Sequence, residues 1–138
     1  MRVFVTGVAG QLGHDIMNDL ATRGYEGIGT DIAPEYNGIS DDTAVTHMPY
    51  ISLDITDRVA VESTIAKINP DAVIHCAAWT AVDRAEDKEN RQKVHAINAD
   101  GTQNIADACK KIDAKMVYIS TDYVFDGQGT TPWQPDCK

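Results

Sequence analysis

The stretch RVFVTGVAGQLGHDIMNDLATR, residues 2–23, decides the fold. Its first five residues, Arg2–Thr6, form an apolar run rich in strand-forming residues, which predicts a buried strand. Three glycines at a spacing of three follow at once: Gly7, Gly10 and Gly13. The remainder, Gln11–Arg23, has a helical pattern whose apolar face consists of Leu12, Ile16 and Leu20.

A strand, a glycine turn and a helix in this order are typical of a dinucleotide-binding cradle. The glycines permit a tight turn and a close approach of the backbone to a pyrophosphate, while the helix N-terminus supplies N–H groups and a positive dipole. The spacing is G-x-x-G-x-x-G rather than the commoner G-x-G-x-x-G. Taken alone, the glycines could also serve only as turn residues.

Two carboxylates are candidates for the nucleoside end of such a cofactor. Asp31 ends the second predicted strand about 20 residues after the glycines, where a carboxylate accepts hydrogen bonds from the adenosine ribose and repels a 2′-phosphate. This position favours NADH over NADPH. Asp54 follows the third strand, where it could meet the adenine amino group while Ile55 covers a ring face. Both aspartates could instead form turns or cap helices.

Strand and helix patterns alternate along the chain and predict an α/β doubly wound parallel sheet, the Rossmann fold. The expected strands are Arg2–Thr6, Glu26–Thr30, Tyr50–Leu53, Ala72–Cys76 and Lys115–Ser120. The expected helices are Gln11–Arg23, Arg58–Ile68 and a long one around Lys88–Lys111 that is broken near its start. Asp57 is the expected N-cap of the second helix, and Asn69-Pro70 its end.

The segment Ala33–Pro49 is polar and without a period, so we expect a surface loop. With 138 residues the chain is long enough for one domain, residues 1–138. Open sheets of this kind usually continue beyond five strands, so we expect the domain to be truncated, with a C-terminal substrate domain absent. An unpaired sheet edge would then favour self-association, including a non-native oligomer.

Composition excludes several classes of function. The net charge of −9 and only twelve Lys plus Arg argue against nucleic acid and anionic membranes as partners. No apolar run approaches the ~20 residues of a membrane span, and the chain enters its first strand directly, so we expect a cytoplasmic protein. The three cysteines and four histidines have no metal-ligand spacing. We therefore expect free thiols and no metal site.

Three segments together carry a specific resemblance. These are Thr6–Gly13, the run AAWTAVDRAE at residues 77–86, and STDYVFDG at residues 120–127. With them, the chain resembles the dTDP-4-dehydrorhamnose reductase family of the extended short-chain dehydrogenase/reductase group over nearly its whole length. The resemblance implies reduction, by NADH or NADPH, of the 4-keto group of a dTDP-linked 6-deoxy sugar in dTDP-L-rhamnose biosynthesis.

The resemblance also implies roles for individual residues. The pyrophosphate would lie on Gly10, Gln11 and Leu12, within the turn Gly7–Gly13. The remaining cofactor positions would be Asp31, Ile32, Asp54, Ile55, Ala77, Ala78, Trp79, Thr80 and Ile119. Ala77 and Ala78 are small enough to let a flat cofactor approach the backbone, although core packing also explains them. Asn98 would support proton transfer, and Thr121, Asp122 and Tyr123 would contact the dTDP-sugar.

The family's chemistry needs a carbonyl-binding hydroxyl, here Thr121, together with a proton-donating tyrosine and a lysine. No Tyr-x-x-x-Lys occurs in these 138 residues, and its expected position lies beyond Lys138. We therefore expect the chain alone to bind cofactor without turnover. Tyr118, in the last strand, is expected in the core. Two other functions stay open: a non-catalytic subunit resembling the regulatory subunit of methionine adenosyltransferase, and an extended-group epimerase or dehydratase.

Overall fold

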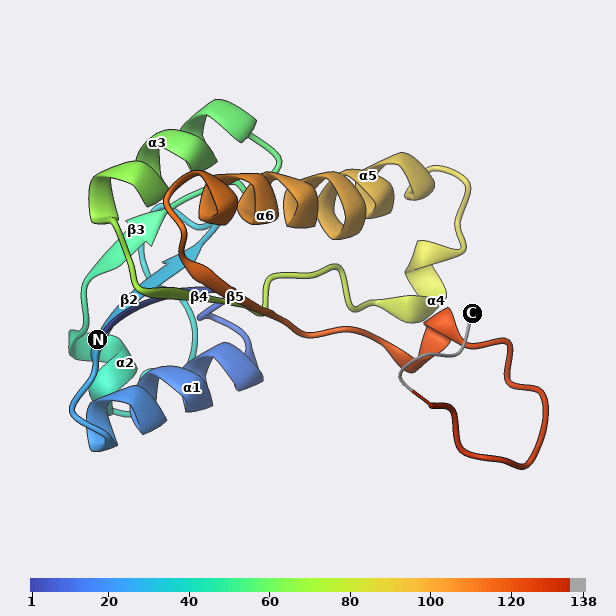
Figure 1. Ribbon diagram of the computed structural model, residues 1–138, viewed down its shortest axis with the longest axis horizontal. Helices are drawn as coiled ribbons and strands as arrows, with labels where there is room; N and C mark the ends of the chain where they lie inside the picture. The colour runs from blue at the N-terminus through green and yellow to red at the C-terminus, as the bar shows by residue number, and fades with distance from the viewer. Residues whose placement is uncertain (135–138) are drawn as a thin grey trace.

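The computed structural model describes residues 1–134 and shows one five-stranded parallel sheet (Figure 1). The strand order is β3-β2-β1-β4-β5, so the chain turns to the other side of β1 after β3. The strands are β1 (Arg2–Thr6), β2 (Glu26–Asp31), β3 (Tyr50–Ser52), β4 (Ala72–His75) and β5 (Lys115–Tyr118). The predicted α/β doubly wound fold is confirmed, and every expected strand begins at its predicted residue.

Helices cover both faces of the sheet (Figure 1). One face carries α1 (Gln11–Thr22) and the short α2 (Ala44–His47), while the other carries α3 (Arg58–Ile68) and α6 (Thr102–Lys111). Two short α-helices, one π-helix and one 3₁₀ turn complete the described elements: α4 (Val82–Ala85), α5 (Arg91–His95), the π-helix η1 (Ala96–Gly101) and the 3₁₀ turn η2 (Asp122–Val124).

The alternation of side chains along β1 divides the core into two layers. Phe4 packs with Val73, Ile65 and Ile105 beneath α3 and α6. Val3 and Val5 point the other way and pack with Val8, Met17 and Leu20 beneath α1. A parallel strand buried on both faces reads as a continuous apolar run, which is why RVFVT showed no polar alternation.

Local signals at the ends of α3 act as the sequence predicted. The Asp57 side chain accepts a hydrogen bond from the backbone N–H of Ala60 at 3.0 Å and caps the helix. Asn69 takes a left-handed conformation with φ of 48°, and Pro70 prevents the helix from continuing.

Removal of this cap should destabilise the protein. Asp57→Ala should lower the free energy of unfolding by about 1 kcal/mol, because the Ala60 N–H loses its acceptor. Urea denaturation measures the change. Ser63→Ala on the same helix is the control, and we expect it to stay within about 0.5 kcal/mol of the parent. Equal losses in the two variants would contradict a capping role.

The expected apolar face of α1 is wrong in part. Leu12 is 45% exposed at the cleft, and Met17 is buried with Leu20 instead.

Further expectations about local structure were wrong. The segment Ala33–Pro49 is not wholly a surface loop, because it contains α2, whose Val45 is buried in the α1 layer. The long helix begins at Arg91 rather than near Lys88, whereas the break expected near its start is present as the π-helix η1. Tyr118 is 47% exposed instead of lying in the core, because β5 is an edge strand with no neighbour on its outer side among the described residues.

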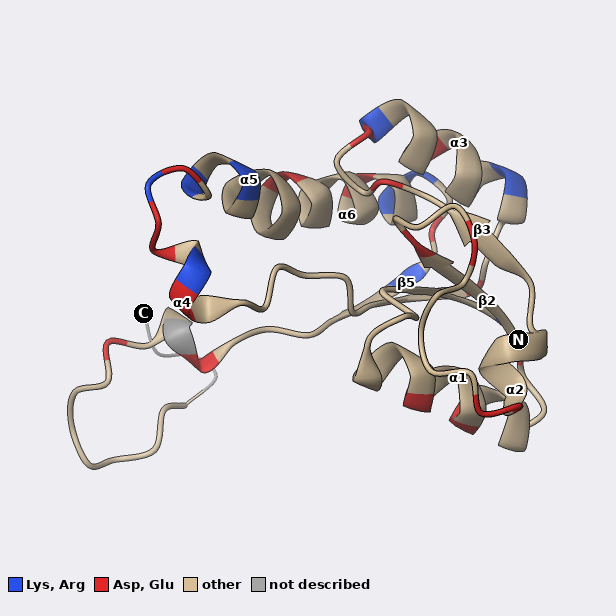
Figure 2. Ribbon diagram, turned by 180° about the vertical axis from the view of Figure 1, so that it is seen from behind, with Lys and Arg blue, Asp and Glu red and all other residues tan. Residues whose placement is uncertain are grey.

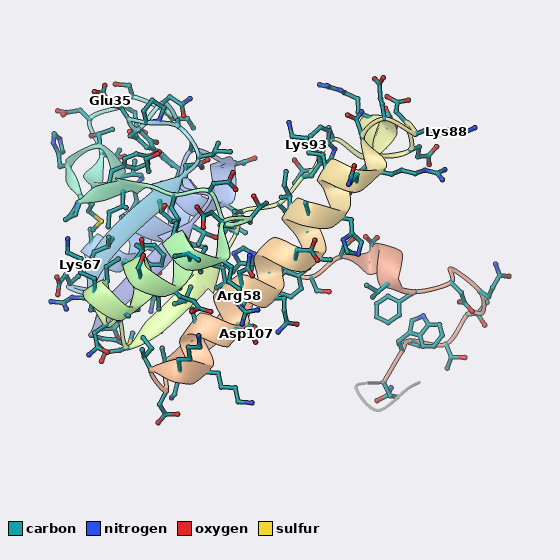
Figure 3. The ribbon with its side chains drawn as sticks, turned by 90° about the horizontal axis from the view of Figure 1, so that it is seen from above. Glu35, Arg58, Lys67, Lys88, Lys93 and Asp107 are labelled. Atoms are coloured by element: carbon teal, nitrogen blue, oxygen red, sulfur yellow. The ribbon has the colours of Figure 1, made fainter. Side chains whose placement is uncertain are left out.

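Basic and acidic residues are interspersed over α3, α4 and α6, whereas α1 carries only acidic ones, and no single basic surface forms (Figure 2). The Glu62 carboxylate of α3 forms ion pairs with Arg58 Nε at 3.0 Å and with Lys111 Nζ of α6 at 2.7 Å. Arg58 also reaches Asp107 at 3.5 Å (Figure 3). Within residues 1–134, no helix has the length and apolar character needed to cross a membrane.

Candidate functional site

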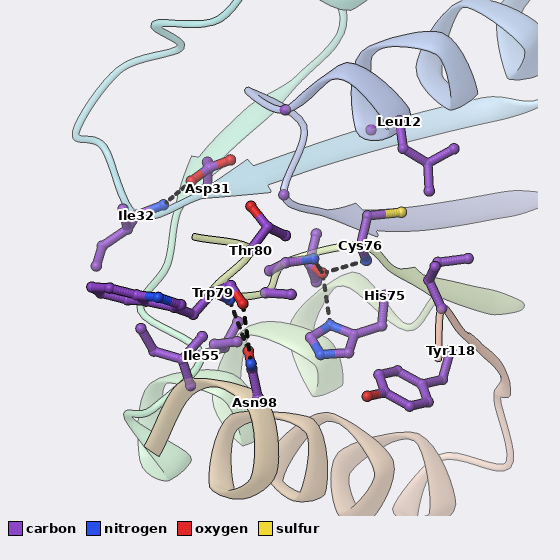
Figure 4. A pocket seen from close by; sticks show the side chains of 18 of the residues that line it. Leu12, Asp31, Ile32, Ile55, His75, Cys76, Trp79, Thr80, Asn98 and Tyr118 are labelled. Atoms are coloured by element: carbon purple, nitrogen blue, oxygen red, sulfur yellow. Dashed lines mark hydrogen bonds between the residues drawn. The ribbon is translucent and has the colours of Figure 1, made fainter. Parts of the chain in front are cut away.

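An open cleft of about 1080 Å³ lies at the carboxyl ends of the parallel strands (Figure 4). This is the edge where open α/β sheets bind ligands, at the point where the strand order reverses. The structure brings to this cleft every residue predicted to bind cofactor, together with the two predicted catalytic residues. They are Gly7, Gly10, Gln11, Leu12, Gly13, Asp31, Ile32, Asp54, Ile55, Ala77, Ala78, Trp79, Thr80, Asn98, Ile119 and Thr121.

The glycine turn has the geometry of a phosphate cradle. Gly7 has a φ of +73°, and its N–H donates to the carbonyl of Thr30 at 2.8 Å. Gly10 is the N-cap of α1 and has no side chain to satisfy the first-turn N–H groups of the helix. A Cβ on Gly13 would come within van der Waals overlap of the Gly7 carbonyl, so close packing of helix on turn requires glycine here. The helix N-terminus therefore faces the cleft with available donors.

Asp31 connects the glycine turn to the end of β2. One carboxylate oxygen accepts from the N–H of Ala9 at 3.0 Å, and the other accepts from the N–H of Ile32 at 2.8 Å. Each oxygen has a second lone pair, so the carboxylate can still accept from a ligand hydroxyl in the cleft. Its turn-forming role and its predicted ligand role are therefore compatible.

Asp54 is held in its own turn. Its Oδ1 accepts from the N–H of Thr56 at 2.9 Å and from the Thr56 hydroxyl at 2.7 Å. The carboxylate does not cap α3, which is capped by Asp57. Asp54 and the buried Ile55 still line the cleft, and the adenine contact predicted for them remains a prediction.

Ala77–Thr80 forms a wall of the cleft that is held by Asn98. The Asn98 Oδ1 accepts from the backbone N–H of Trp79 at 2.7 Å, and its Nδ2 donates to the Trp79 carbonyl at 3.2 Å. The Trp79 indole lies on the same side of the cleft as Ile32 and Ile55 (Figure 4), with Arg84 and Lys93 within 6 Å of the ring centroid. Asn98 thus positions the wall rather than reaching across the cleft.

The predicted substrate residues are only partly at the cleft. Thr121 lines it, and its hydroxyl lies 3.5 Å from the Asp122 carboxylate. Asp122 and Tyr123 lie in η2, and Asp122 is outside the cleft lining. The side chain of Tyr123 lies outside the described ones, and Cys137 lies outside the described residues. Ala78, Thr80, Thr121 and Asp122 are exposed, so this end of the cleft is open.

Sequence reasoning missed several residues that line the cleft, notably Thr6, His75, Cys76 and Tyr118. Burial raises the pKa of Cys76 to about 11, so its thiol stays protonated, and Cys76 and Cys109 are both free as predicted. His75 is 1% exposed. A histidine at the carboxyl end of an otherwise apolar strand was the signal that could have found it. Within residues 1–134, no group of three or more His, Cys, Asp or Glu is arranged to hold a metal.

Comparison with known proteins places the chain in one family. The family model described as RmlD substrate binding domain matches residues 1–138. A dTDP-4-dehydrorhamnose reductase of Streptomyces griseus is 38% identical over 135 residues, which are 98% of this chain and 38% of that protein. One of Mycolicibacterium smegmatis is 37% identical over 136 residues, which are 98% of this chain and 35% of that protein.

Solved structures of the same family are similar to this chain in sequence and fold. The dTDP-4-dehydrorhamnose reductase of Clostridium acetobutylicum has a TM-score of 0.81 and 36% identity, with 100% of this chain and 42% of that chain covered. The Bacillus anthracis enzyme in complex with NADP has a TM-score of 0.73 and 38% identity, with 91% of this chain and 38% of that chain covered. The chain therefore spans about two fifths of the length of the relatives it matches. Over that length, its sequence and its Rossmann fold show that it belongs to the RmlD substrate binding domain family.

Proposed function

We propose that this chain forms the cofactor-binding part of an NAD(P)H-dependent dTDP-4-dehydrorhamnose reductase. The observation that carries the proposal is the convergence of the glycine turn, Asp31, the Ala77–Thr80 wall and Thr121 on one cleft. The relatives named above supply the reaction: reduction of a 4-keto dTDP-sugar. In this proposal the substrate is a dTDP-linked 6-deoxy sugar.

The residues present fit a nicotinamide dinucleotide. A Cβ on Gly10 would meet only the Gly7 carbonyl, at 3.4 Å, so the glycine leaves open space over the first turn of α1 where a pyrophosphate would lie. Asp31 would accept from the ribose hydroxyls, and Ile55 would cover a face of the adenine. The bound cofactor would supply hydride.

Thr121 is the chain's own contribution to the reacting carbonyl. Its hydroxyl, exposed at the open end of the cleft, would donate to the substrate oxygen and stabilise the charge that develops there. Asp122 at 3.5 Å would orient that hydroxyl before substrate binds. The Tyr-x-x-x-Lys of the family is not among these residues, so we propose that this chain binds cofactor without turning over the sugar.

Asp31 provides the test of cofactor binding and of cofactor choice. We propose that its carboxylate favours NADH by repelling the 2′-phosphate of NADPH. Asp31→Asn should shift the ratio of the two dissociation constants toward NADPH by about tenfold, or about 1.4 kcal/mol, because the like charge is removed. Cofactor quenching of Trp79 fluorescence, measured in a Trp133→Phe background, gives both constants.

Asp54→Asn is the matched control, because it removes an equal charge from a carboxylate engaged with Thr56 and should leave the ratio unchanged. A ratio that Asp31→Asn does not move would overturn the assigned preference. Failure of the parent chain to bind either nucleotide, even at concentrations on the order of millimolar, would overturn the cofactor site itself.

A further inference from the structure

His75 has a buried imidazole that the proposed chemistry does not use. It ends β4, is 1% exposed, and lies in register with Thr6 of β1 and Tyr118 of β5. The Tyr118 ring stacks on it at a centroid distance of 5.9 Å. A buried polar side chain is costly unless both of its nitrogens are paired, and here both are.

The first pairing assigns the proton positions. The Thr6 hydroxyl accepts from the N–H of Cys76 at 3.2 Å and from the N–H of Ala77 at 3.1 Å. The Cys76 N–H is shared with the Thr6 carbonyl at 3.3 Å. With both N–H groups directed at its lone pairs, the hydroxyl donates its single proton to Nδ1 of His75 at 2.7 Å. Nδ1 is therefore an acceptor and carries no hydrogen.

The second pairing completes the assignment. The Thr102 hydroxyl donates its proton to the carbonyl of Asn98 at 2.9 Å. Its remaining contact, with Nε2 of His75 at 3.1 Å, must therefore be one in which the imidazole donates. Both ring nitrogens then have a partner with a single hydrogen between them, so His75 is neutral, with its hydrogen on Nε2.

These bonds join two segments of the cleft wall. One end of the series is the backbone of Cys76 and Ala77, and the other is the Asn98 carbonyl within η1. The Asn98 side chain then returns to Trp79 through two further bonds (Figure 4). The peptide chain between Ala77 and Trp79 closes these bonds into one hydrogen-bonded circuit, which links the two segments.

The π-helical turn supports a functional interpretation of the circuit. A π-turn inserts one extra residue into a helix, is rare, and occurs frequently at functional sites. Here it spans Ala96–Gly101 and contains Asn98, whose side chain projects to the Trp79 backbone. Thr102 begins α6 immediately after this turn, and its hydroxyl donates back to the Asn98 carbonyl within the turn.

We propose that His75 is a positioning residue for the cofactor cleft: as a neutral imidazole protonated on Nε2, it holds the Ala77–Trp79 wall and Asn98 in one arrangement through Thr6 and Thr102. The inference deepens the proposed function and rests on it for the ligand. The hydrogen-bond circuit itself does not depend on which ligand binds.

Thr102 offers a matched pair of variants that leaves the imidazole in place. Thr102→Val keeps the shape but removes both hydroxyl bonds, whereas Thr102→Ser keeps the hydroxyl. We expect Thr102→Val to weaken NADH binding by about five- to tenfold and Thr102→Ser to retain the parent affinity. Measurements are made below the unfolding transition of each variant, so that a loss of stability alone does not change the dissociation constant.

Two nuclear magnetic resonance signals test the circuit without any ligand. The ¹⁵N shifts of His75 should report hydrogen on Nε2 and none on Nδ1, and the amide proton of Trp79 should move upfield in Thr102→Val but not in Thr102→Ser. If these signals behave as expected while the parent chain binds no NADH, the proposed function fails and the circuit stands. An Nδ1-protonated ring, or Val and Ser variants that match in the Trp79 signal and in affinity, would overturn the inference.

Discussion

Gly7→Ala is expected to lower the free energy of unfolding by about 3 kcal/mol, since two costs add at one position. Gly7 has a φ of +73°, a conformation that disfavours any residue with a Cβ. A Cβ there would also lie 2.7 Å from the backbone nitrogen of Ala77 and 2.8 Å from its Cα. These are backbone atoms of a neighbouring strand's continuation, so neither can rotate away.

Gly24→Ala separates the two costs. Gly24 has nearly the same φ, +70°, but a Cβ built there meets nothing within 4 Å. We expect this variant to lose only the conformational part, about 1 kcal/mol. Urea denaturation of both variants in parallel gives the difference. Similar losses in the two would show that close packing of the glycine turn on the Ala77 wall contributes nothing.

The same comparison extends to binding. Relief of the Gly7 overlap would push the turn away from Ala77, and both segments line the cleft. We therefore expect Gly7→Ala to weaken cofactor binding as well, whereas Gly24 lies at the far end of α1 and its variant should bind as the parent does.

The features that sequence alone predicted well are those with local causes. Residues 2–23 contain the local signals for β1, the glycine turn and α1, and the order of these elements predicts a dinucleotide-binding turn. Asp57 and Asn69 mark the ends of α3 through interactions that span only a few residues. The cleft followed from the same logic, because all parallel strands deliver their carboxyl ends to one edge.

The errors arose where distant parts of the chain decide the outcome. The four-residue helix α2 is too short to show a period, and Val45 anchors it only because α1 presents an apolar face there. The apolar strand predicts Tyr118 as a core residue, but Tyr118 is exposed because β5 lies at the sheet edge. The residues Ala96–Gly101 have an ordinary helical pattern, and nothing local marks them as a π-turn.

The circuit around His75 could not be predicted for the same reason. Its partners, Thr6 and Thr102, lie 69 and 27 residues away in the chain. A threonine at the end of a strand and one at the start of a helix are unremarkable until the fold places both against one imidazole. A buried histidine between two hydroxyls then has a measurable consequence for stability.

His75 should make this protein sensitive to mild acid. Burial lowers the pKa of His75 to about 4, whereas an unfolded histidine titrates at 6.5. As the pH falls below 6.5, the His75 imidazole is protonated in the unfolded chain but stays neutral in the folded protein. The free energy of unfolding therefore declines from its value at pH 7 until the pH reaches about 4. The gap corresponds to about 3 kcal/mol. That is a large part of the 5–15 kcal/mol typical of a domain.

His14 titrates in the opposite sense and above this range. The Asp15 carboxylate, followed by Asp41, raises the pKa of His14 above its ordinary 6.5. Its contribution to stability is therefore complete below pH 6.5 and lost as the pH rises through the folded pKa. Well below pH 6.5, His14 is protonated in both states and adds no slope. His14 therefore does not cause the decline in this window, which combines His75 with carboxylates such as Glu62, whose pKa is lowered by Lys111 and Arg58.

His75→Asn isolates the effect. Asparagine can accept from the Thr6 hydroxyl but does not titrate, and it loses the bond to Thr102. We expect the variant to be less stable than the parent at pH 7, and the stability difference to shrink by about 3 kcal/mol as the pH falls to 4. Carboxylates that titrate in this range are common to both proteins and cancel in the difference. Urea denaturation at several pH values measures it, and a difference independent of pH would mean that His75 accepts a proton in the folded protein as readily as in the unfolded chain.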